Sequence, residues 1–565
     1  MYANLKTRYT YEGVPHSEYP RPTMRRDSYI TLNGEWDFAI ALEGETPIYD
    51  KRIVVPFAPE SMASGIGEVY DEKYARWYRT EVVLPLDFDK GRVILHLGSV
   101  DQRATVYLNG EVVCEHVGGY TPFEVDISDY LREKNILEVK AVDILSDYVE
   151  PYGKQKVDRG GMWYTPISGI WGSVWLESVP SRYISSLKVN ILDGGVSVEV
   201  GGVETAEILL TTPDGVQTHE VIGGKCYIPI PTPRLWSPDD PYLYRYEVVT
   251  EEDRVQSYFA IRHIQIEEIG GVPRITLNGK PIFFHAVLDQ GYYSDGIYTP
   301  VALQAYTDDI EYIKSLGFNT IRKHIKIEPE YFYYECDRLG MIVWQDMVNN
   351  GKYSFFKDTV LPTIGFLNKN DKNLHPNPKS REAFVRTMLE TMSLLDKHPS
   401  VCYYTIFNEG WGQFDSQSAY RLAKSIEKDR IIDTTSGWFR CGDSDVDSRH
   451  IYFRKLKIKP ATKPVVISEF GGIVYSVEGH VYNLDKSYGY SKVNSREQFV
   501  KKFRDLYLLE VLPLIKKGLC GTVYTQLSDI EDEINGLITY DREVKKIYRE
   551  EFEDISRMLY EEING

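Results

Sequence analysis

The chain is poor in cysteine and has no long apolar or basic run. Each of these shortages argues against one class of protein or site. Its 565 residues contain 6 cysteines, scattered without CxxC pairs or metal-ligand spacing, which argues against a disulfide framework or a zinc site. No stretch reaches about 18 uninterrupted apolar residues, so no membrane-spanning helix is expected. The start, "MYANLKTRYTYEGVPHSEYP", lacks the apolar segment of a signal peptide. We therefore expect a cytoplasmic protein with reduced thiols.

The charge balance excludes other classes of partner. The formal net charge is −18, and no dense Lys/Arg run is present, which argues against nucleic acid or an anionic membrane as the main partner. No GxGxxG or P-loop motif indicates a nucleotide cofactor, and no Asp/Glu/His set identifies a metal, although a structural divalent cation stays open. The 43 Tyr and 9 Trp suit sugar binding and β-sheet cores alike, so they decide neither.

What the sequence does contain is three regions of different periodicity. Short runs such as "RVILHLGSV" and "RATVYLNGEVV" alternate apolar and polar residues, and they predict an all-β sandwich over residues 1–180. Further short strand-like runs over 181–268 predict a small seven-stranded sandwich, with Trp236 as a packing anchor. From 269 to 565, eight apolar strand-like runs alternate with amphipathic helical ones, which predicts a (β/α)₈ barrel. An open doubly wound sheet is the alternative, disfavoured by the missing nucleotide motifs.

Polar side chains are concentrated at the ends of the predicted barrel strands. Catalytic groups of a (β/α)₈ barrel lie at the carboxyl ends of its strands. The predicted strands end in Asp289, His324, Asp346, Asn408-Glu409, Trp438, Tyr452, Glu469 and Gln526. We therefore expect the active site among these residues.

Glu409 and Glu469 are the strongest catalytic candidates. They end the fourth and the seventh predicted strands, which face each other across a barrel mouth. Paired carboxylates about 5 Å apart are what a retaining glycosidase requires, one as nucleophile and the other as acid and base. A lone Glu after a strand is more often a salt-bridge partner. The flanking groups favour function, since Asn408 can bond a sugar hydroxyl and Trp411 can form an aromatic wall.

The motifs as a set resemble glycoside hydrolase family 2, the group of β-galactosidases, β-glucuronidases and β-mannosidases. The resemblance covers nearly the whole chain and rests on "LNGEWDF", "YARWYRTEVVLP", "SGIWGSVWLESV", "SLGFNTIRKHI", "CDRLGMIVWQDM", "IFNEGWG", "ISEFGG" and "EINGLITYDR". It implies a sugar-binding jelly roll, an immunoglobulin-like sandwich and a catalytic TIM barrel. It also implies that Glu409 is the acid/base, Glu469 the nucleophile and Asn408 a ligand of the 2-hydroxyl.

The resemblance implies further residues around these three. In "SRHIYF", Tyr452 would lie beside the nucleophile, with His450 near the site, and Arg322 of "TIRKHI" would bond the nucleophile. Trp438 and Trp344 are candidate walls of the sugar pocket, with barrel packing as the equal alternative for each.

The sugar itself is less clear because the family's substrate motifs are altered. The Asn-x-Lys of the glucuronidases is missing from "EINGLITYDR", and "IRKHIKIEP" replaces the "SHYP" of the β-galactosidase type, while "GMIVWQDM" is closer to the mannosidases. The cluster Arg322, Lys323, His324 and Lys326 is expected to be divided by strand alternation and partly paired with buried acids. A sharper hypothesis has His324 or Lys326 binding a sugar hydroxyl or carboxylate.

These observations predict a retaining exo-glycosidase, with a β-galactoside as the expected substrate. The alternatives are a β-uronidase for galacturonides or glucuronides, a β-mannosidase, an α-L-arabinosidase, an inverting enzyme and a noncatalytic carbohydrate-binding protein. The partner expected is a carbohydrate, and a homo-oligomer stays open. The loops 288–300 and 349–377 are candidate substrate contacts with no assigned role.

Overall fold

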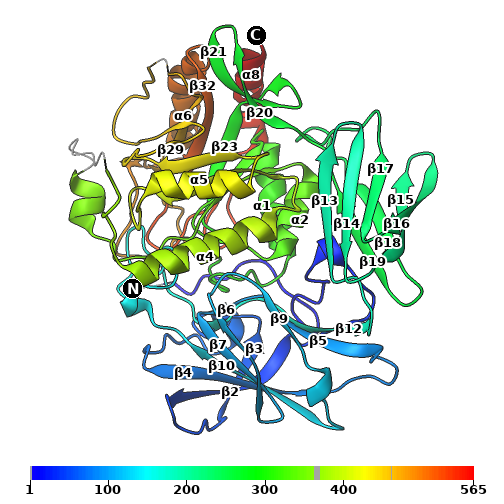
Figure 1. Ribbon diagram of the computed structural model, residues 1–565. Helices are drawn as coiled ribbons and strands as arrows, with labels where there is room; N and C mark the ends of the chain where they lie inside the picture. The colour runs from blue at the N-terminus through cyan, green and yellow to red at the C-terminus, as the bar shows by residue number, and fades with distance from the viewer. Residues whose placement is uncertain (1–2, 362–369, 460) are drawn as a thin grey trace.

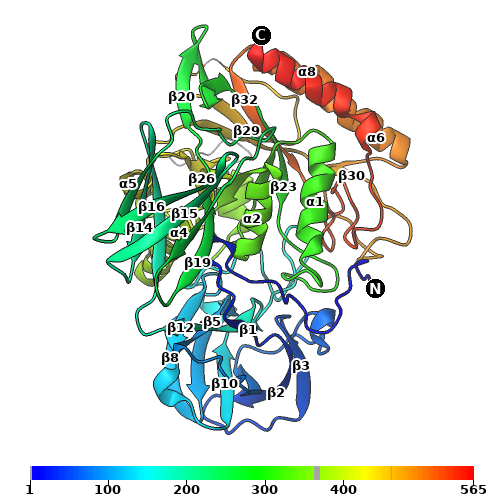
Figure 2. The ribbon, with the colours of Figure 1, turned by 90° about the vertical axis from the view of Figure 1, so that its right-hand side faces the viewer.

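The computed structural model describes residues 3–361, 370–459 and 461–565, which form three parts in chain order. Figures 1 and 2 show the first part, blue to cyan, at one end of the molecule, the green second part beside it, and the barrel at the other end. None of the helices in these ranges has the length and apolar character that a membrane span needs.

The first part is an antiparallel β-sandwich, as the alternating pattern predicts. Within the described residues its two main sheets have the strand orders β1-β12-β5-β9 and β3-β2-β4-β10-β7-β8. Every second side chain of β7 is buried, so each strand contributes one face to a core around Trp36, Phe38 and Tyr78. The strands are β1 (Tyr29–Thr31), β2 (Gly34–Leu42), β3 (Lys51–Val55), β4 (Tyr74–Val82), β5 (Gly91–Leu97), β6 (Val100–Asp101), β7 (Arg103–Leu108), β8 (Glu111–Val117), β9 (Phe123–Asp126), β10 (Asn135–Val142), β11 (Gly169–Ile170) and β12 (Val174–Pro180).

The second part is a seven-stranded antiparallel sheet within the described residues, in the order β13-β14-β17-β16-β15-β18-β19. Its strands are β13 (Ser186–Leu192), β14 (Gly195–Gly201), β15 (Thr205–Thr212), β16 (Gly215–Ile222), β17 (Lys225–Pro229), β18 (Tyr244–Val249) and β19 (Arg254–Phe259). Trp236 is fully buried and donates its indole N–H to the Asp337 carbonyl, so it anchors this part to the barrel.

A small sheet follows between the second part and the barrel. It contains β20 (Ile264–Ile269), β21 (Val272–Leu277) and β22 (Lys280–Pro281), and both views place it at the end of the barrel remote from the first part. Its residues Ile264, Ile275 and Leu277 pack with Phe284 of the barrel interior. The strand β20 pairs with β21 of this sheet. The predicted boundary between the second part and the barrel, at residues 268 and 269, falls within β20.

The third part is a barrel of parallel strands. The described residues form an eight-stranded sheet in the order β27-β26-β25-β24-β23-β32-β29-β28. The two end strands, β27 and β28, lie side by side and close the ring. The Ser436 hydroxyl of β27 lies 2.9 Å from His450 Nε2 of β28. The strands are β23 (Phe284–Asp289), β24 (Thr320–Lys323), β25 (Ile342–Asp346), β26 (Val401–Asn408), β27 (Ile431–Ser436), β28 (Asp447–Ile451), β29 (Val465–Gly471) and β32 (Leu519–Thr525).

Helices cover the outside of the barrel (Figure 1). They are α1 (Gln304–Ser315), α2 (Glu330–Leu339), α4 (Pro378–Leu395), α5 (Ser416–Ile426), α6 (Arg496–Leu506), α7 (Leu512–Ile515) and α8 (Glu553–Asn564), with π-helical turns at Phe355–Val360 and Tyr507–Val511. Every barrel strand overlaps a run predicted from the sequence, although β28 and β32 begin before their predicted runs "HIYF" and "CGTVYTQL". The predicted fold class is confirmed.

A long irregular segment of the first part crosses to the barrel. We call residues 148–168, between β10 and β11, the arm. Trp163 of the arm packs edge-on against Trp411 of the barrel with ring centroids 5.0 Å apart, and the Tyr152 hydroxyl donates to the Gly351 carbonyl at 2.9 Å. The two parts therefore share one aromatic core at the carboxyl ends of the barrel strands.

The two loops without an assigned role differ in what the structure describes. Residues 291–300 are buried between the first part and the barrel, and the Thr299 hydroxyl donates to the Trp171 carbonyl at 2.7 Å. That loop therefore contributes to the interface between the two parts. Within 349–377, residues 362–369 lie outside the described residues.

Candidate active site

Glu409 and Glu469 lie on opposite sides of the barrel mouth. Glu409 follows the last residue of β26 and has a φ of 55°, a conformation that a residue with a side chain rarely adopts. Its backbone N–H donates to the Ser436 carbonyl at 2.9 Å, which fixes that turn. Glu469 lies within β29 and is 5% exposed. The costly backbone conformation of Glu409, at a partly buried acid, is typical of a functional position.

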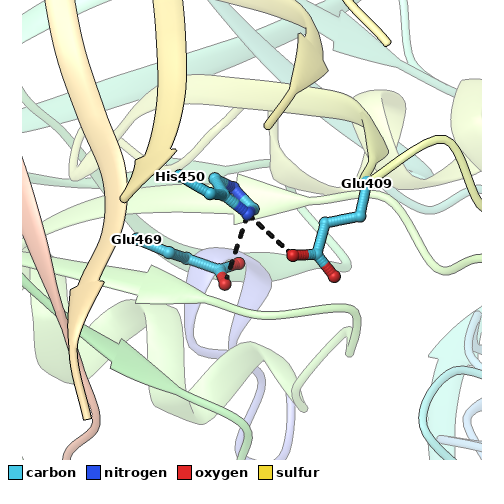
Figure 3. Close-up of side chains that lie close together, drawn as sticks. All are labelled: Glu409, His450 and Glu469. Atoms are coloured by element: carbon cyan, nitrogen blue, oxygen red, sulfur yellow. Dashed lines mark hydrogen bonds and ion pairs between the residues drawn. The ribbon is translucent and has the colours of Figure 1, made fainter. Parts of the chain in front are cut away.

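His450 connects the two carboxylates. Its Nδ1 lies 2.9 Å from Glu409 Oε1 and 3.4 Å from Glu469 Oε2, and its Nε2 lies 2.9 Å from the Ser436 hydroxyl (Figure 3). The two carboxylate oxygens that face this nitrogen lie within 4.8 Å of each other. That separation fits the roughly 5 Å of a retaining glycosidase and is shorter than the roughly 6.5–9.5 Å of an inverting enzyme.

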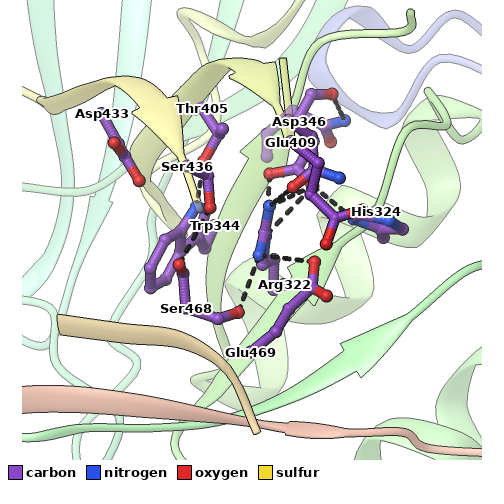
Figure 4. A network of polar contacts seen from close by, with 12 residues as sticks. Arg322, His324, Trp344, Asp346, Thr405, Glu409, Asp433, Ser436, Ser468 and Glu469 are labelled. Carbon is purple, nitrogen blue, oxygen red and sulfur yellow. Dashed lines mark hydrogen bonds and ion pairs between the residues drawn. The ribbon is translucent and has the colours of Figure 1, made fainter. Parts of the chain in front are cut away.

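Arg322 of β24 holds Glu469, the candidate nucleophile, through its guanidinium. Its guanidinium is fully buried, donates to Glu469 Oε1 at 3.2 Å and the Ser468 carbonyl at 2.7 Å, and pairs with Asp346 at 3.0 Å (Figure 4). It also donates to Asn408 Oδ1 at 3.0 Å. Since that oxygen is occupied, the Asn408 NH₂ group is the one that can donate to a sugar hydroxyl.

Tyr452 holds the other oxygen of Glu469. Its hydroxyl donates to Glu469 Oε2 at 2.6 Å, and its ring stacks on Tyr490 with centroids 3.8 Å apart. Burial, together with the neighbouring Glu469 charge, raises the pKa of Tyr452 well above its usual value. The phenol therefore stays a hydrogen-bond donor. The sequence pattern did not indicate Tyr490, which follows no barrel strand.

The electrostatics of Glu409 are dominated by its neighbours. Burial alone would raise its pKa, but the hydrogen bond and charge of His450, with the charges of Lys154 and His324, lower the pKa to about 2. His324 lies nearby with Nδ1 2.6 Å from Asp346 Oδ2. Burial lowers the pKa of His324 in spite of that carboxylate. His324 is thus at the site, oriented by Asp346.

Several predicted binding residues are engaged elsewhere. The Lys326 ammonium donates to the Gly291 and Tyr298 carbonyls at 2.6 and 2.8 Å, and it lies 2.9 Å from Glu328. The carboxylate of Asp289 pairs with Lys323 at 2.5 Å. The Lys326 ammonium is therefore engaged within the protein. Contacts of Lys326 and Asp289 with a sugar stay predictions.

Gln526 has its side chain in a buried amide network. Its carbonyl oxygen accepts from Gln290 at 2.7 Å, and its NH₂ group donates to Asn535 at 3.0 Å. Its expected contact with a sugar stays a prediction.

The three predicted tryptophans have different positions. Trp344 is fully buried inside the barrel, against Tyr403 and under Arg322, so it does not line the pocket and our assignment of it as a wall is wrong. The Trp411 ring is 3% exposed and faces the arm. Trp438 is partly exposed and lies edge-on to His450 at 5.5 Å, which is the position of a pocket wall.

One group of three side chains could hold a metal ion by distance within the described residues, and it is Glu409, His450 and Glu469. The same atoms already bond to one another through the His450 imidazole. A metal is therefore not needed to explain why they lie together.

The comparisons with known proteins agree with this geometry. Residues 67–156 match the glycosyl hydrolase 2 galactose-binding domain-like model, residues 185–262 the glycosyl hydrolases family 2 model, and residues 270–556 the glycosyl hydrolases family 2 TIM barrel domain model. The chain belongs to glycosyl hydrolase family 2. The resemblance noted in the sequence is thereby confirmed.

The family 2 relatives differ in their substrates. A β-galactosidase of Thermoanaerobacter pseudethanolicus is 26% identical over 52% of this chain and 42% of its own length. A β-glucuronidase of Felis catus is 25% identical over 74% of this chain and 68% of its own length. The crystal structure of a GH2 β-galacturonidase from Eisenbergiella tayi, bound to galacturonate, superposes with a TM-score of 0.68 at 19% identity, covering 95% of this chain and 98% of that one. The chain spans less than half the length of the bacterial β-galactosidase.

Proposed function

We propose that this protein is a retaining exo-glycosidase that hydrolyses β-uronides. The observation that carries the retaining chemistry is the separation of the two carboxylates, whose facing oxygens lie within 4.8 Å across the barrel mouth. Only side chains take part in the proposed reaction, so it requires no cofactor. The binding partner is a carbohydrate.

The reaction follows from the positions of the two acids. Glu469, held by Arg322 and Tyr452, attacks the anomeric carbon, and the bond from that carbon to the leaving oxygen breaks. Glu409 gives a proton to that oxygen. A water molecule then loses a proton to Glu409 and attacks the same carbon, which frees Glu469 and restores both acids.

The choice of a uronide replaces our expectation of a β-galactoside as the leading reading. The cat relative is a β-glucuronidase, and the Eisenbergiella protein is a β-galacturonidase bound to galacturonate. The Thermoanaerobacter relative keeps a β-galactoside as the second candidate. Both sugars fit the same double displacement, so the catalytic residues do not separate the two candidates.

The experiment is hydrolysis of p-nitrophenyl β-glucuronide, β-galacturonide, β-galactoside, β-glucoside, β-mannoside and α-L-arabinoside. We expect a uronide to be preferred by the wild type and turnover to fall at least 1,000-fold in Glu469→Gln, because the nucleophile is lost. Glu409→Ala should regain activity with azide, which is already an anion and needs no general base to remove a proton.

The product stereochemistry tests the mechanism separately. Proton NMR of the first product should show the β-anomer, as double displacement requires. An α-anomer would establish inversion and overturn the assignment of Glu469. No turnover of any substrate by folded wild-type protein would favour the noncatalytic carbohydrate-binding alternative.

A further inference from the structure

The arm places one lysine of the first part at the barrel mouth. The Gly153 N–H donates to the Asn349 carbonyl at 3.2 Å, and the Tyr164 N–H donates to the Lys154 carbonyl at 3.0 Å. A Cβ on Gly153 would lie 2.9 Å from the Ile325 carbonyl oxygen, so the arm contacts the residues that follow β24 directly. The backbone at Lys154 is therefore fixed against the loops after β24 and β25.

The Lys154 side chain is buried without a counter-ion. The residue is 8% exposed, and its ammonium lies 5.9 Å from the centroid of the Trp163 ring. Within the described ranges no carboxylate lies within 4.0 Å of this ammonium. The stem of the side chain is thus buried, while the Nζ atom itself keeps some contact with solvent. An ammonium held in this way without an anion can form a charge-assisted hydrogen bond with a carboxylate that enters the mouth.

The neighbours of Lys154 show which space it faces. Its charge lowers the pKa of Glu409, and it opposes the rise that burial causes in the pKa of Glu533. Glu533 is itself bonded to the Tyr164 hydroxyl and to Asn535 at 2.9 Å. The charge of Lys154 also acts on His324. The geometry agrees, because Trp163 lies beside this ammonium and packs on Trp411, two residues after Glu409. Lys154 therefore faces the same space as the acid/base candidate.

The other buried cations around the mouth are already satisfied. Arg322 is paired with Asp346 and Glu469, Lys323 with Asp289 and Glu328, and Lys326 bonds two carbonyls and Glu328. These contacts range from 2.5 to 3.2 Å. A carboxylate arriving with the substrate would have to compete for any of these three, but not for Lys154.

We propose that Lys154 binds the carboxylate of the uronide and so determines the preference for an acidic sugar over its neutral analogue. This inference rests on the proposed function. The ammonium forms a charge-assisted hydrogen bond to the carboxylate, whereas a neutral sugar offers it no charged partner. Specificity would then come from a domain that contributes neither of the two catalytic acids.

The experiment compares Lys154→Met with Lys156→Met in the full-length protein. Lys156 is the matched control because it lies on the same arm, 4.9 Å from the same Trp163 ring. We measure kcat/KM for β-galacturonide against β-galactoside and for β-glucuronide against β-glucoside. For Lys154→Met we expect a loss of about 10- to 100-fold on the uronides and little change on the neutral sugars, as for one charged hydrogen bond. Lys156→Met should resemble the wild type.

The outcomes separate this inference from the proposed function. Equal losses on acidic and neutral sugars in Lys154→Met would overturn the inference while the proposed function stands. Wild-type protein that hydrolyses neutral sugars and no uronide would overturn the proposed function and the inference with it. If Lys154→Met melts far below the wild type, Lys154→Gln and Lys154→Arg repeat the comparison, and only Lys154→Arg should keep the uronide preference.

Discussion

His450 is the side chain with the strongest effect on the acid/base candidate. Burial would raise the pKa of Glu409, but the hydrogen bond and charge of His450 lower it. The contact is 2.9 Å long, and the proposed reaction requires Glu409 to give a proton. His450 therefore opposes proton retention on the group that must donate.

Replacing His450 should therefore change the pH dependence. In His450→Gln the hydrogen bond and charge that lower the pKa of Glu409 are lost, while burial still raises it. The carboxyl should then stay protonated to a higher pH, so we expect the alkaline limb of kcat/KM to move to higher pH. Tyr452→Phe is the control, since it touches Glu469 and not Glu409. An unchanged alkaline limb in His450→Gln would contradict this role of His450.

The sequence predicted the inner residues of the site better than the outer ones. Asn408 and Glu409 follow from the position at which their strand ends, and Tyr452 and Arg322 follow from the family resemblance. Trp344 was misplaced because it is two residues deeper than Asp346 on the same strand. Both side chains point inward, but two residues of strand correspond to about 6.6 Å of depth. The sequence did not indicate Lys154 as a site residue. It lies in the irregular arm, and no local pattern there shows which barrel strand the arm contacts.

The strand β24 shows how one short element satisfies several buried charges. Arg322 points into the barrel toward Asp346 and Glu469, whereas Lys323 points out toward Asp289 and Glu328. The predicted division of this basic cluster by strand alternation is confirmed. Arg322 and Lys323 each lie between two acids, so the stability of the barrel wall depends on both cations and on their four carboxylate partners.

Removing the inward cation should destabilise the fold. Arg322→Met leaves the carboxylates of Asp346 and Glu469 buried without their counter-charge, which costs roughly 3–5 kcal/mol. Chemical denaturation should show this loss. Arg92→Met is the control, because Arg92 forms a half-exposed pair with Asp126 at 2.9 Å, worth at most about 1 kcal/mol. Similar losses in both variants would mean that the buried network contributes little.

At the scale of elements, the regular pattern was predictable and the connections between domains were not. The barrel strands have buried faces on both sides, and their apolar runs are visible in the sequence. The arm has no periodicity, and its contacts with Glu531 and Glu533 join residues far apart in the chain. Local sequence pattern carries no information on such pairings.

The whole molecule is held together by charges between its parts. Arg26 pairs with Asp253 of the second part at 2.8 Å and with Glu177 of the first at 3.2 Å. Burial would raise the pKa of Glu177, but the His96 hydrogen bond and the charges of Arg21 and Arg26 lower it to about 2. The junction between the two sandwiches therefore depends on an ionised Glu177.

Acid should weaken this junction. Since the pKa of Glu177 is lowered from 4.5 to about 2 on folding, its carboxylate stabilises the protein above about pH 4.5, and this contribution is lost as the pH falls toward 2. The contribution is about 3 kcal/mol. Melting curves should show Glu177→Gln less stable than the wild type at pH 7, with a difference that shrinks below pH 4.5. Glu133→Gln, at an exposed position, should show no such trend.

The bond between Tyr164 and Glu533 has a consequence for synthesis on the ribosome. The two residues lie 369 positions apart, and translation at 5–20 residues per second separates them by roughly 20–70 s. The last barrel strand, β32, is also made late, and it must pair with β23 before the ring closes. For that interval the newborn first domain carries the aromatic arm uncovered. A chaperone that protects nascent chains would have this period, and this surface, in which to act.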